Sequence, residues 1–131
     1  MADIIEDSKG MAERLLEIPR LMQTSEKKIG ALGIKIKGIA FSMTEIEKKT
    51  YAEVSTEKGD DGKPLYTNDG MRQAEVNKRL GQNTEYKIFQ EEESDTARKM
   101  YEEKADLEFI KKEFEAYRLI IELTKVTFRM A

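Results

Sequence analysis

Apolar residues recur with a seven-residue repeat near each end of the chain. Their separations alternate between three and four positions, which keeps one apolar stripe on one side of an α-helix. The first series is Met11, Leu15, Ile18, Met22, Ser25, Ile29, Leu32, Ile36, Ile39, Met43 and Ile46, and the second is Leu107, Ile110, Phe114, Tyr117, Ile121, Thr124 and Phe128. Between them, residues 58–70 are dense in Gly, Asp, Pro and Asn, which is typical of a turn. The pattern predicts an all-α, coiled-coil-like antiparallel hairpin of two long helices.

We expect a single domain over residues 1–131, with helical arms at about 11–57 and 85–130 and a tip insert at 58–84. Proline removes a backbone hydrogen bond, so Pro19 predicts a kink or a break in the first arm near Ile18. Residues 32–39 are compatible with a strand of alternating apolar residues and with a helix. The unbroken seven-residue repeat favours the helix.

The insert contains Asp61-Gly62, a dipeptide typical of tight turns. Residues 51–54 and 64–67 could pair around it as a small β-hairpin. A short helix is expected to follow, capped by Thr67 or Asn68, and Thr84 is expected to cap the last helix.

A second apolar series lies on another face of the C-terminal helix, and we call it the C-terminal apolar stripe. Its members are Phe109, Ala116, Leu119, Leu123, Val126 and Met130, and the first helix has a weaker version at Ala31, Ile34, Gly38 and Phe41. A two-helix hairpin buries one face of each arm, and a second exposed apolar face is unusual on a soluble monomer. We therefore expect a homo-oligomer whose interface includes Ile34, Phe41 and the stripe. The alternative is that segments 1–18 and 71–80 fold back over these faces.

Composition narrows the chemistry. The chain has no Cys and no His, which removes thiol nucleophiles, zinc sites and the commonest general base. No glycine-rich phosphate loop is present. We therefore expect a non-enzymatic protein with no cofactor, no metal and no small-molecule substrate. The acidic N-terminal segment and the lack of a long apolar run predict a soluble intracellular protein with no membrane partner.

The net charge of −3 argues against a protein that coats nucleic acid by bulk charge, so binding would need a local basic strip. The first arm offers one, because residues 27–43 hold four lysines and no acid. We use the name lysine strip for Lys27, Lys28, Lys35, Lys48 and Lys49. It could follow a phosphate backbone. The alternative is that these lysines pair with acids of the other arm, namely Glu91, Glu92, Glu93, Asp95, Glu102 or Glu103.

The tip supplies a second candidate site for a single strand, formed by Lys63, Tyr66, Arg72 and Arg79. Basic groups beside an aromatic ring can bind phosphates and stack a base. The alternative is a turn followed by an ordinary helix surface. The acidic clusters at 91–93 and 102–106 are interpreted as solvated faces, because no histidine accompanies them.

The order of these features resembles the small recombination mediator proteins of tailed phages. The resemblance rests on a basic N-terminal helix, the turn Asp60-Asp61-Gly62-Lys63-Pro64-Leu65-Tyr66, the short charged segment at 71–76 and the apolar C-terminal helix from Phe114 to Met130. It implies a helical homo-oligomer that binds single-stranded DNA and helps to load a recombinase onto strands coated by single-strand-binding protein. It also implies a location in the cytoplasm of a bacterial or phage-infected cell. The other hypothesis is a coiled-coil adaptor, inhibitor or chaperone-like module with no nucleic-acid binding.

Overall fold

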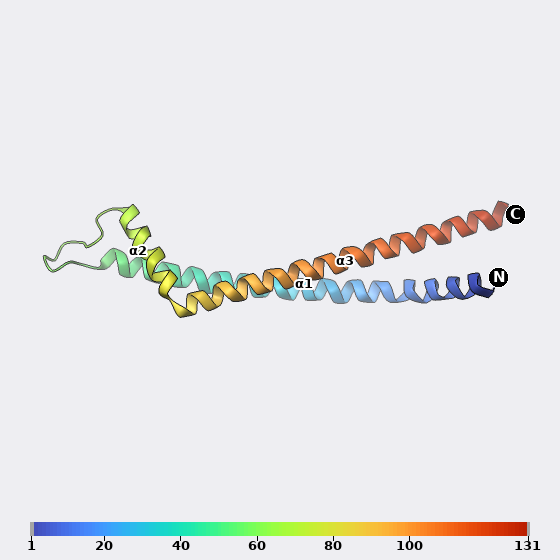
Figure 1. The fold of residues 1–131 in the computed structure, drawn as a ribbon, viewed down its shortest axis with the longest axis horizontal. Helices are drawn as coiled ribbons and strands as arrows, with labels where there is room; N and C mark the ends of the chain where they lie inside the picture. The colour runs from blue at the N-terminus through green and yellow to red at the C-terminus, as the bar shows by residue number, and fades with distance from the viewer. Residues whose placement is uncertain (1, 131) are drawn as a thin grey trace. The chain divides into compact units, whose positions relative to one another are not determined.

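The computed structural model describes the backbone of residues 2–130 and the side chains of residues 9–127 and 129. Three helices make up this part of the chain: α1 (Ala2–Thr56), α2 (Asp69–Gln82) and α3 (Thr84–Met130) (Figure 1). They form two compact units, one from residues up to 32 with residues from 99 onward, and one from residues 33–98. In each unit a part of α1 packs antiparallel to a part of α3. The all-α helical hairpin is therefore confirmed.

Helix α1 is continuous through both places where the sequence was ambiguous. Residues 32–39 are helical, as the seven-residue repeat favours, and Pro19 lies inside the helix. The sequence predicts a kink or a break near Ile18, and the break is wrong because the helix continues through Pro19. Proline deletes a single hydrogen bond to the preceding turn, and the side chain of Ile18 is completely buried. Packing next to the proline therefore holds the helix together where backbone propensity would end it.

The first unit buries the two apolar series against each other. Leu107 is buried, and Met11, Leu15, Ile110, Phe114 and Tyr117 are partly buried. Ser25 is a buried polar member, and its hydroxyl donates a 2.8 Å hydrogen bond to the Glu103 carboxylate on α3. This polar contact favours the observed register of the two helices, because a slipped register would lose the hydrogen bond to Glu103.

An ion pair flanks the same helix pair. Arg14 on α1 donates from Nε to Oε1 of Glu113 at 2.7 Å and from Nη2 to Oε2 at 3.1 Å. The two parallel hydrogen bonds make the pair bidentate, which adds geometric specificity to the charge attraction. The Arg14 guanidinium holds the pKa of the Glu113 carboxyl below its usual range, chiefly through these hydrogen bonds.

The heptad repeat of α3 begins further upstream than the apolar residues indicate. Tyr86, Phe89, Glu93, Thr96, Met100 and Glu103 continue the alternation of three and four, and each is buried or partly buried. Thr96 is almost fully buried and donates to the Glu92 carbonyl at 2.6 Å. Polar residues at heptad positions conceal this part of the repeat in the sequence.

The second unit has a core of its own, formed by Val54, Val76, Leu80 and Tyr86. Met43, Ile46, Tyr51 and Tyr66 pack around it. Asn68 caps α2 by accepting from the Met71 N–H at 2.8 Å, as one of the two predictions has it. Asn83 accepts from the Tyr86 N–H at 2.9 Å at the start of α3, so the prediction that Thr84 is the cap is wrong.

The predicted β-hairpin is also wrong. Residues 51–54 belong to α1, and within residues 2–130 the insert makes only an isolated antiparallel bridge between Lys58 and Pro64. The turn inside it is held by the Gly59 N–H, which donates to the Lys63 carbonyl at 2.9 Å. Gly62 has a φ of 75°, a left-handed conformation that glycine adopts without steric cost. The buried face of Val54 explains the difference, because α1 needs its last turn to complete the core.

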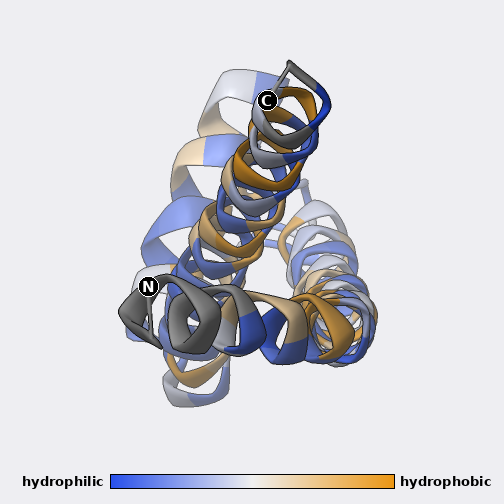
Figure 2. Ribbon diagram, turned by 90° about the vertical axis from the view of Figure 1, so that its right-hand side faces the viewer, coloured by the Kyte–Doolittle hydropathy of each residue, from blue (hydrophilic) through white to orange (hydrophobic). Residues whose placement is uncertain are grey.

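The C-terminal apolar stripe stays exposed. Phe109 is 70% exposed, Leu119 58%, Leu123 67% and Val126 51%, and Ala116 is exposed too. Apolar segments recur along this part of α3 in Figure 2. The side chains of Phe128 and Met130, the last members of the two C-terminal series, lie outside the described residues.

The alternative that segments 1–18 and 71–80 cover the apolar faces is wrong. Residues 2–18 are part of the continuous helix α1, and α2 packs on the core of the second unit. Ile34 and Phe41 on α1 are 75% and 67% exposed. None of the helices over residues 2–130 is long and apolar enough to cross a membrane.

Candidate functional site

The lysine strip is presented on one continuous helix. Its five side chains all lie on α1 and all are exposed. Within the described side chains, none of the five lies within ion-pair distance of a carboxylate of either helix. The alternative that these lysines form ion pairs with acids of α3 is therefore not seen among the described side chains. Lys28 nevertheless lines surface grooves together with Glu103 and Asp106 of α3.

The tip residues differ from the strip because most of them have structural partners. Lys63 is exposed, whereas Tyr66 is partly buried against the core of the second unit. Arg72 donates from Nη1 to the Tyr66 carbonyl at 3.3 Å. Arg72 therefore helps to hold the loop that precedes α2, and the Tyr66 ring offers less stacking surface than an exposed aromatic would.

Arg79 is the most constrained of the candidate residues. Its guanidinium donates from Nη2 to Glu57 and from Nε to Oε1 of Glu75 at 2.9 Å. The hydrogen bond from Arg79 lowers the pKa of the Glu75 carboxyl. Arg79 thus joins α2 to the residue that follows α1, and two carboxylates already neutralise its charge. A phosphate at Arg79 would have to compete with both carboxylates.

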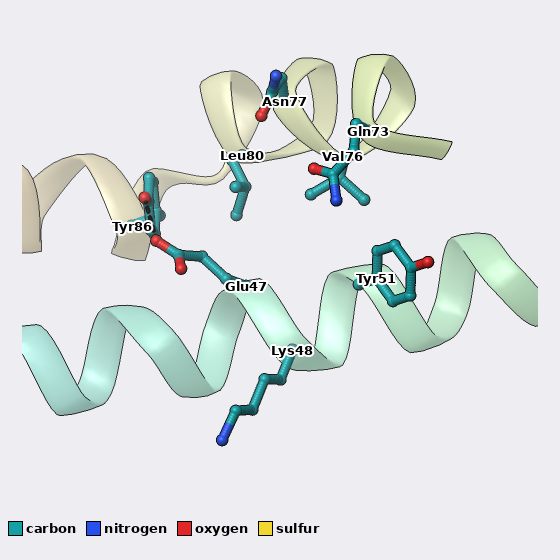
Figure 3. Close-up of a pocket in the computed structure, with 8 residues that line it drawn as sticks. All are labelled: Glu47, Lys48, Tyr51, Gln73, Val76, Asn77, Leu80 and Tyr86. Carbon is teal, nitrogen blue, oxygen red and sulfur yellow. Dashed lines mark hydrogen bonds between the residues drawn. The ribbon is translucent and has the colours of Figure 1, made fainter. Parts of the chain in front are cut away.

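A cavity of about 510 Å³ lies between α1 and α2 in the second unit (Figure 3). Val76 and Leu80 reach from α2 toward α1 and form its apolar wall, and the ring of Tyr51 lies across from Val76. Its volume falls in the range of about 300–1,000 Å³ that is usual for small-ligand pockets.

Two hydrogen bonds fix the aromatic residues that line this cavity. The Tyr86 hydroxyl donates to Oε1 of Glu47 at 2.7 Å, and the Tyr51 hydroxyl donates to Oδ1 of Asp69 at 3.1 Å. The bond to Glu47 and burial together raise the pKa of Tyr86 to about 12. Tyr86 is therefore protonated at neutral pH and keeps the Glu47 carboxylate in one orientation.

The polar groups of the cavity have hydrogen-bonding capacity to spare. Gln73 and Asn77 lie one helical turn apart on α2, and both line the cavity. Neither side-chain amide, nor Oε2 of Glu47, has a hydrogen-bond partner among the described residues. Lys48 lines the rim and reaches away from α2 (Figure 3). The wall is thus apolar and aromatic, and its edge can both donate and accept.

The acidic residues form no candidate metal site in the described part of the chain, where no group of three or more carboxylates is placed to hold an ion.

Apart from Lys48, the residues that line the cavity were not identified as site residues from the sequence. Gln73, Val76, Asn77 and Leu80 follow the spacing of a single helix face, which indicates only that α2 packs on something. Glu47 and Tyr86 are 39 residues apart, so nothing in the sequence signals that they meet. The comparisons add no further guide, because no protein-family model, curated protein or solved structure matches the chain.

Proposed function

We propose that the protein is a non-enzymatic accessory factor in phage-type DNA recombination or replication. In this proposal it binds single-stranded DNA as a homo-oligomer and assists a recombinase or a single-strand-binding protein. The observation that carries the proposal is the lysine strip, whose five exposed side chains lie on one helix without a carboxylate partner among the described residues. The resemblance to phage recombination mediators supports the same function.

Assembly compensates for the acidic net charge. A single copy offers few phosphate contacts, and the whole chain carries a net charge of −3. If several copies associate through the C-terminal apolar stripe, one strand meets several lysine strips at once. Linked binding events of this kind raise the overall affinity without any new contact.

Fluorescence anisotropy with a labelled single-stranded oligonucleotide, titrated at low and high salt, tests the proposal. A variant in which Lys28, Lys35 and Lys49 are replaced by Gln should bind more weakly. Each lost phosphate contact should also reduce the slope of log K against log salt by about 0.7. The matched control replaces three other exposed lysines by Gln, with the same change in net charge: Lys104, Lys112 and Lys125. No binding at low salt would refute the proposal. An equal loss of affinity in both variants would show that the lysine strip is not the binding site.

A second candidate function is a protein–protein adaptor, inhibitor or chaperone-like module. The exposed C-terminal apolar stripe favours it, because an apolar face of this kind is a typical protein interaction surface. For this function, Phe109→Glu or Leu123→Glu should abolish binding to the protein partner. The variant with Lys28, Lys35 and Lys49 replaced by Gln should retain that binding. The same two sets of variants therefore separate the two functions.

A further inference from the structure

An aromatic side chain of α1 lies in solvent beside a lysine. Phe41 is 67% exposed, and the exposed Lys37 precedes it by four residues, which places the two side chains next to each other on one face of the helix. Ile34, two turns before Phe41, is 75% exposed. All three residues belong to the second unit, and residues 33–44 contain two lysines and no acid.

We propose that Phe41 stacks on a base of the bound single strand and that Lys37 binds the neighbouring phosphate. The inference rests on the proposed function and deepens it. It adds an aromatic contact to binding that would otherwise depend on phosphate charge alone, and Lys37 is a cation outside the lysine strip.

The surface next to Phe41 is open. Gly38 precedes Phe41 by three residues and lies on the same face of α1. A methyl group added at Gly38 would meet no atom within 4 Å beyond its immediate neighbours and the local helix backbone. Glycine destabilises a helix interior relative to alanine, and no internal contact requires it here. The missing side chain lets a flat ring approach the backbone beside Phe41.

A single strand matches this surface in both of its chemical parts. Every base can stack on an aromatic side chain, and a cation beside the ring can meet the backbone. Lys37 and Phe41 are separated by about 6 Å along the helix axis, so a nucleotide whose base lies on the ring can keep its phosphate near the ammonium group. The exposed Glu45, one turn after Phe41, repels a phosphate and therefore favours the side of Lys37.

A second copy of the chain suits this face less well. An aromatic side chain buries at most about 250 Å², so Ile34 and Phe41 together fall short of the about 800 Å² that each partner of a stable interface buries. Lysine is also depleted at protein interfaces. The charge and the small apolar area of the face therefore favour a polyanion with aromatic bases.

Tryptophan fluorescence tests the proposal, because the chain contains no tryptophan of its own. Phe41→Trp places an indole at the site, and an indole loses fluorescence when it stacks on a base. We expect oligo(dT) to quench this variant, whereas an abasic strand of equal length, which has the same phosphates, should not. Tyr101→Trp is the matched control and should respond to neither strand, because Tyr101 is 76% exposed and lies on α3 in the first unit.

Affinity provides a second measurement. Phe41→Ala should weaken oligo(dT) binding by about 5- to 150-fold, the usual effect of removing one stacking side chain. The slope of log K against log salt should not change, because no phosphate contact is lost, whereas Lys37→Gln should reduce it by about 0.7. Sedimentation velocity should show the same assembly state for Phe41→Ala and the unmodified protein. A joint loss of assembly and DNA binding would place Phe41 in a subunit interface and overturn the proposal.

The outcomes separate this inference from the proposed function. Oligo(dT) that binds without quenching Phe41→Trp, or that binds Phe41→Ala as tightly as the unmodified protein, would overturn the stacking site and leave single-strand binding intact. Failure of the unmodified protein to bind any single strand at low salt would overturn both.

Discussion

Replacing Leu123 by Glu is the most informative test of assembly. Leu123 lies within the C-terminal apolar stripe and is 67% exposed. Full burial of a leucine side chain stabilises by about 1.5–3 kcal/mol, so covering the exposed two-thirds contributes about 1–2 kcal/mol per copy. In a twofold dimer the loss is doubled to about 2–4 kcal/mol, which corresponds to an affinity about 30- to 700-fold weaker. The buried carboxylate adds a further penalty.

The same reasoning gives the strength of the whole interface. Phe109, Leu119, Leu123 and Val126 each expose between 51% and 70% of their surface. Covering all four in both copies contributes about 8–16 kcal/mol, whereas association costs about 4–15 kcal/mol. The two ranges overlap, so the loss of about 2–4 kcal/mol from one leucine in each copy should be large enough to shift the equilibrium toward monomer at micromolar concentrations.

Sedimentation velocity over a concentration series measures the effect, with circular dichroism to verify that helix content is retained. Leu16→Glu is the matched control, because Leu16 is 82% exposed and lies outside the stripe. We expect Leu123→Glu to be monomeric where the unmodified protein and the control are oligomeric. A monomeric unmodified protein, or an oligomer that Leu123→Glu leaves unchanged, would refute the assembly role of the stripe.

Two further predictions concern the second unit. Arg79→Met should lower the thermal midpoint of the second unit more than Arg72→Met does, because the loss of Arg79 leaves Glu57 and Glu75 without a partner. Equal midpoints of the two variants in calorimetry would contradict this. Tyr86→Phe should reduce the free energy of unfolding at pH 7 by about 1 kcal/mol through loss of the bond to Glu47. Because the folded-state pKa of Tyr86 is raised to about 12 from an ordinary value of about 10, its contribution is complete below pH 10 and disappears as pH rises toward 12. Urea denaturation of both proteins across this window should therefore show the difference shrinking, and a constant difference would count against the bond.

The local elements of the fold followed largely from the sequence. The seven-residue repeats identified both long helices, and Asn68 was recognisable as a cap because its short side chain can accept from the first turn. Errors arose where packing outweighed local preference. Pro19 is tolerated beside the buried Ile18, and Val54 keeps α1 helical where a strand was predicted.

The candidate site was predictable only in part. The lysine strip could be read from spacing, since neighbours along one helix follow from its geometry alone. The partners of Arg79 could not, because Glu57 is 22 residues away in the chain and is brought close only by the loop between α1 and α2. The cavity was equally hidden, since Tyr51, Gln73 and Tyr86 come from three different helices.

The sequence by itself determined the helices, the second apolar face and the excess of lysine on the first arm, because each depends on periodicity within a single segment. The tertiary structure decided which of these features remain available to a partner. It left the C-terminal apolar stripe and the lysine strip exposed, and it used Arg79 in an ion-pair network. It also created the cavity beside Glu47. Hydrogen bonds and ion pairs depend on distances between residues far apart in the chain, and only the folded arrangement sets those distances.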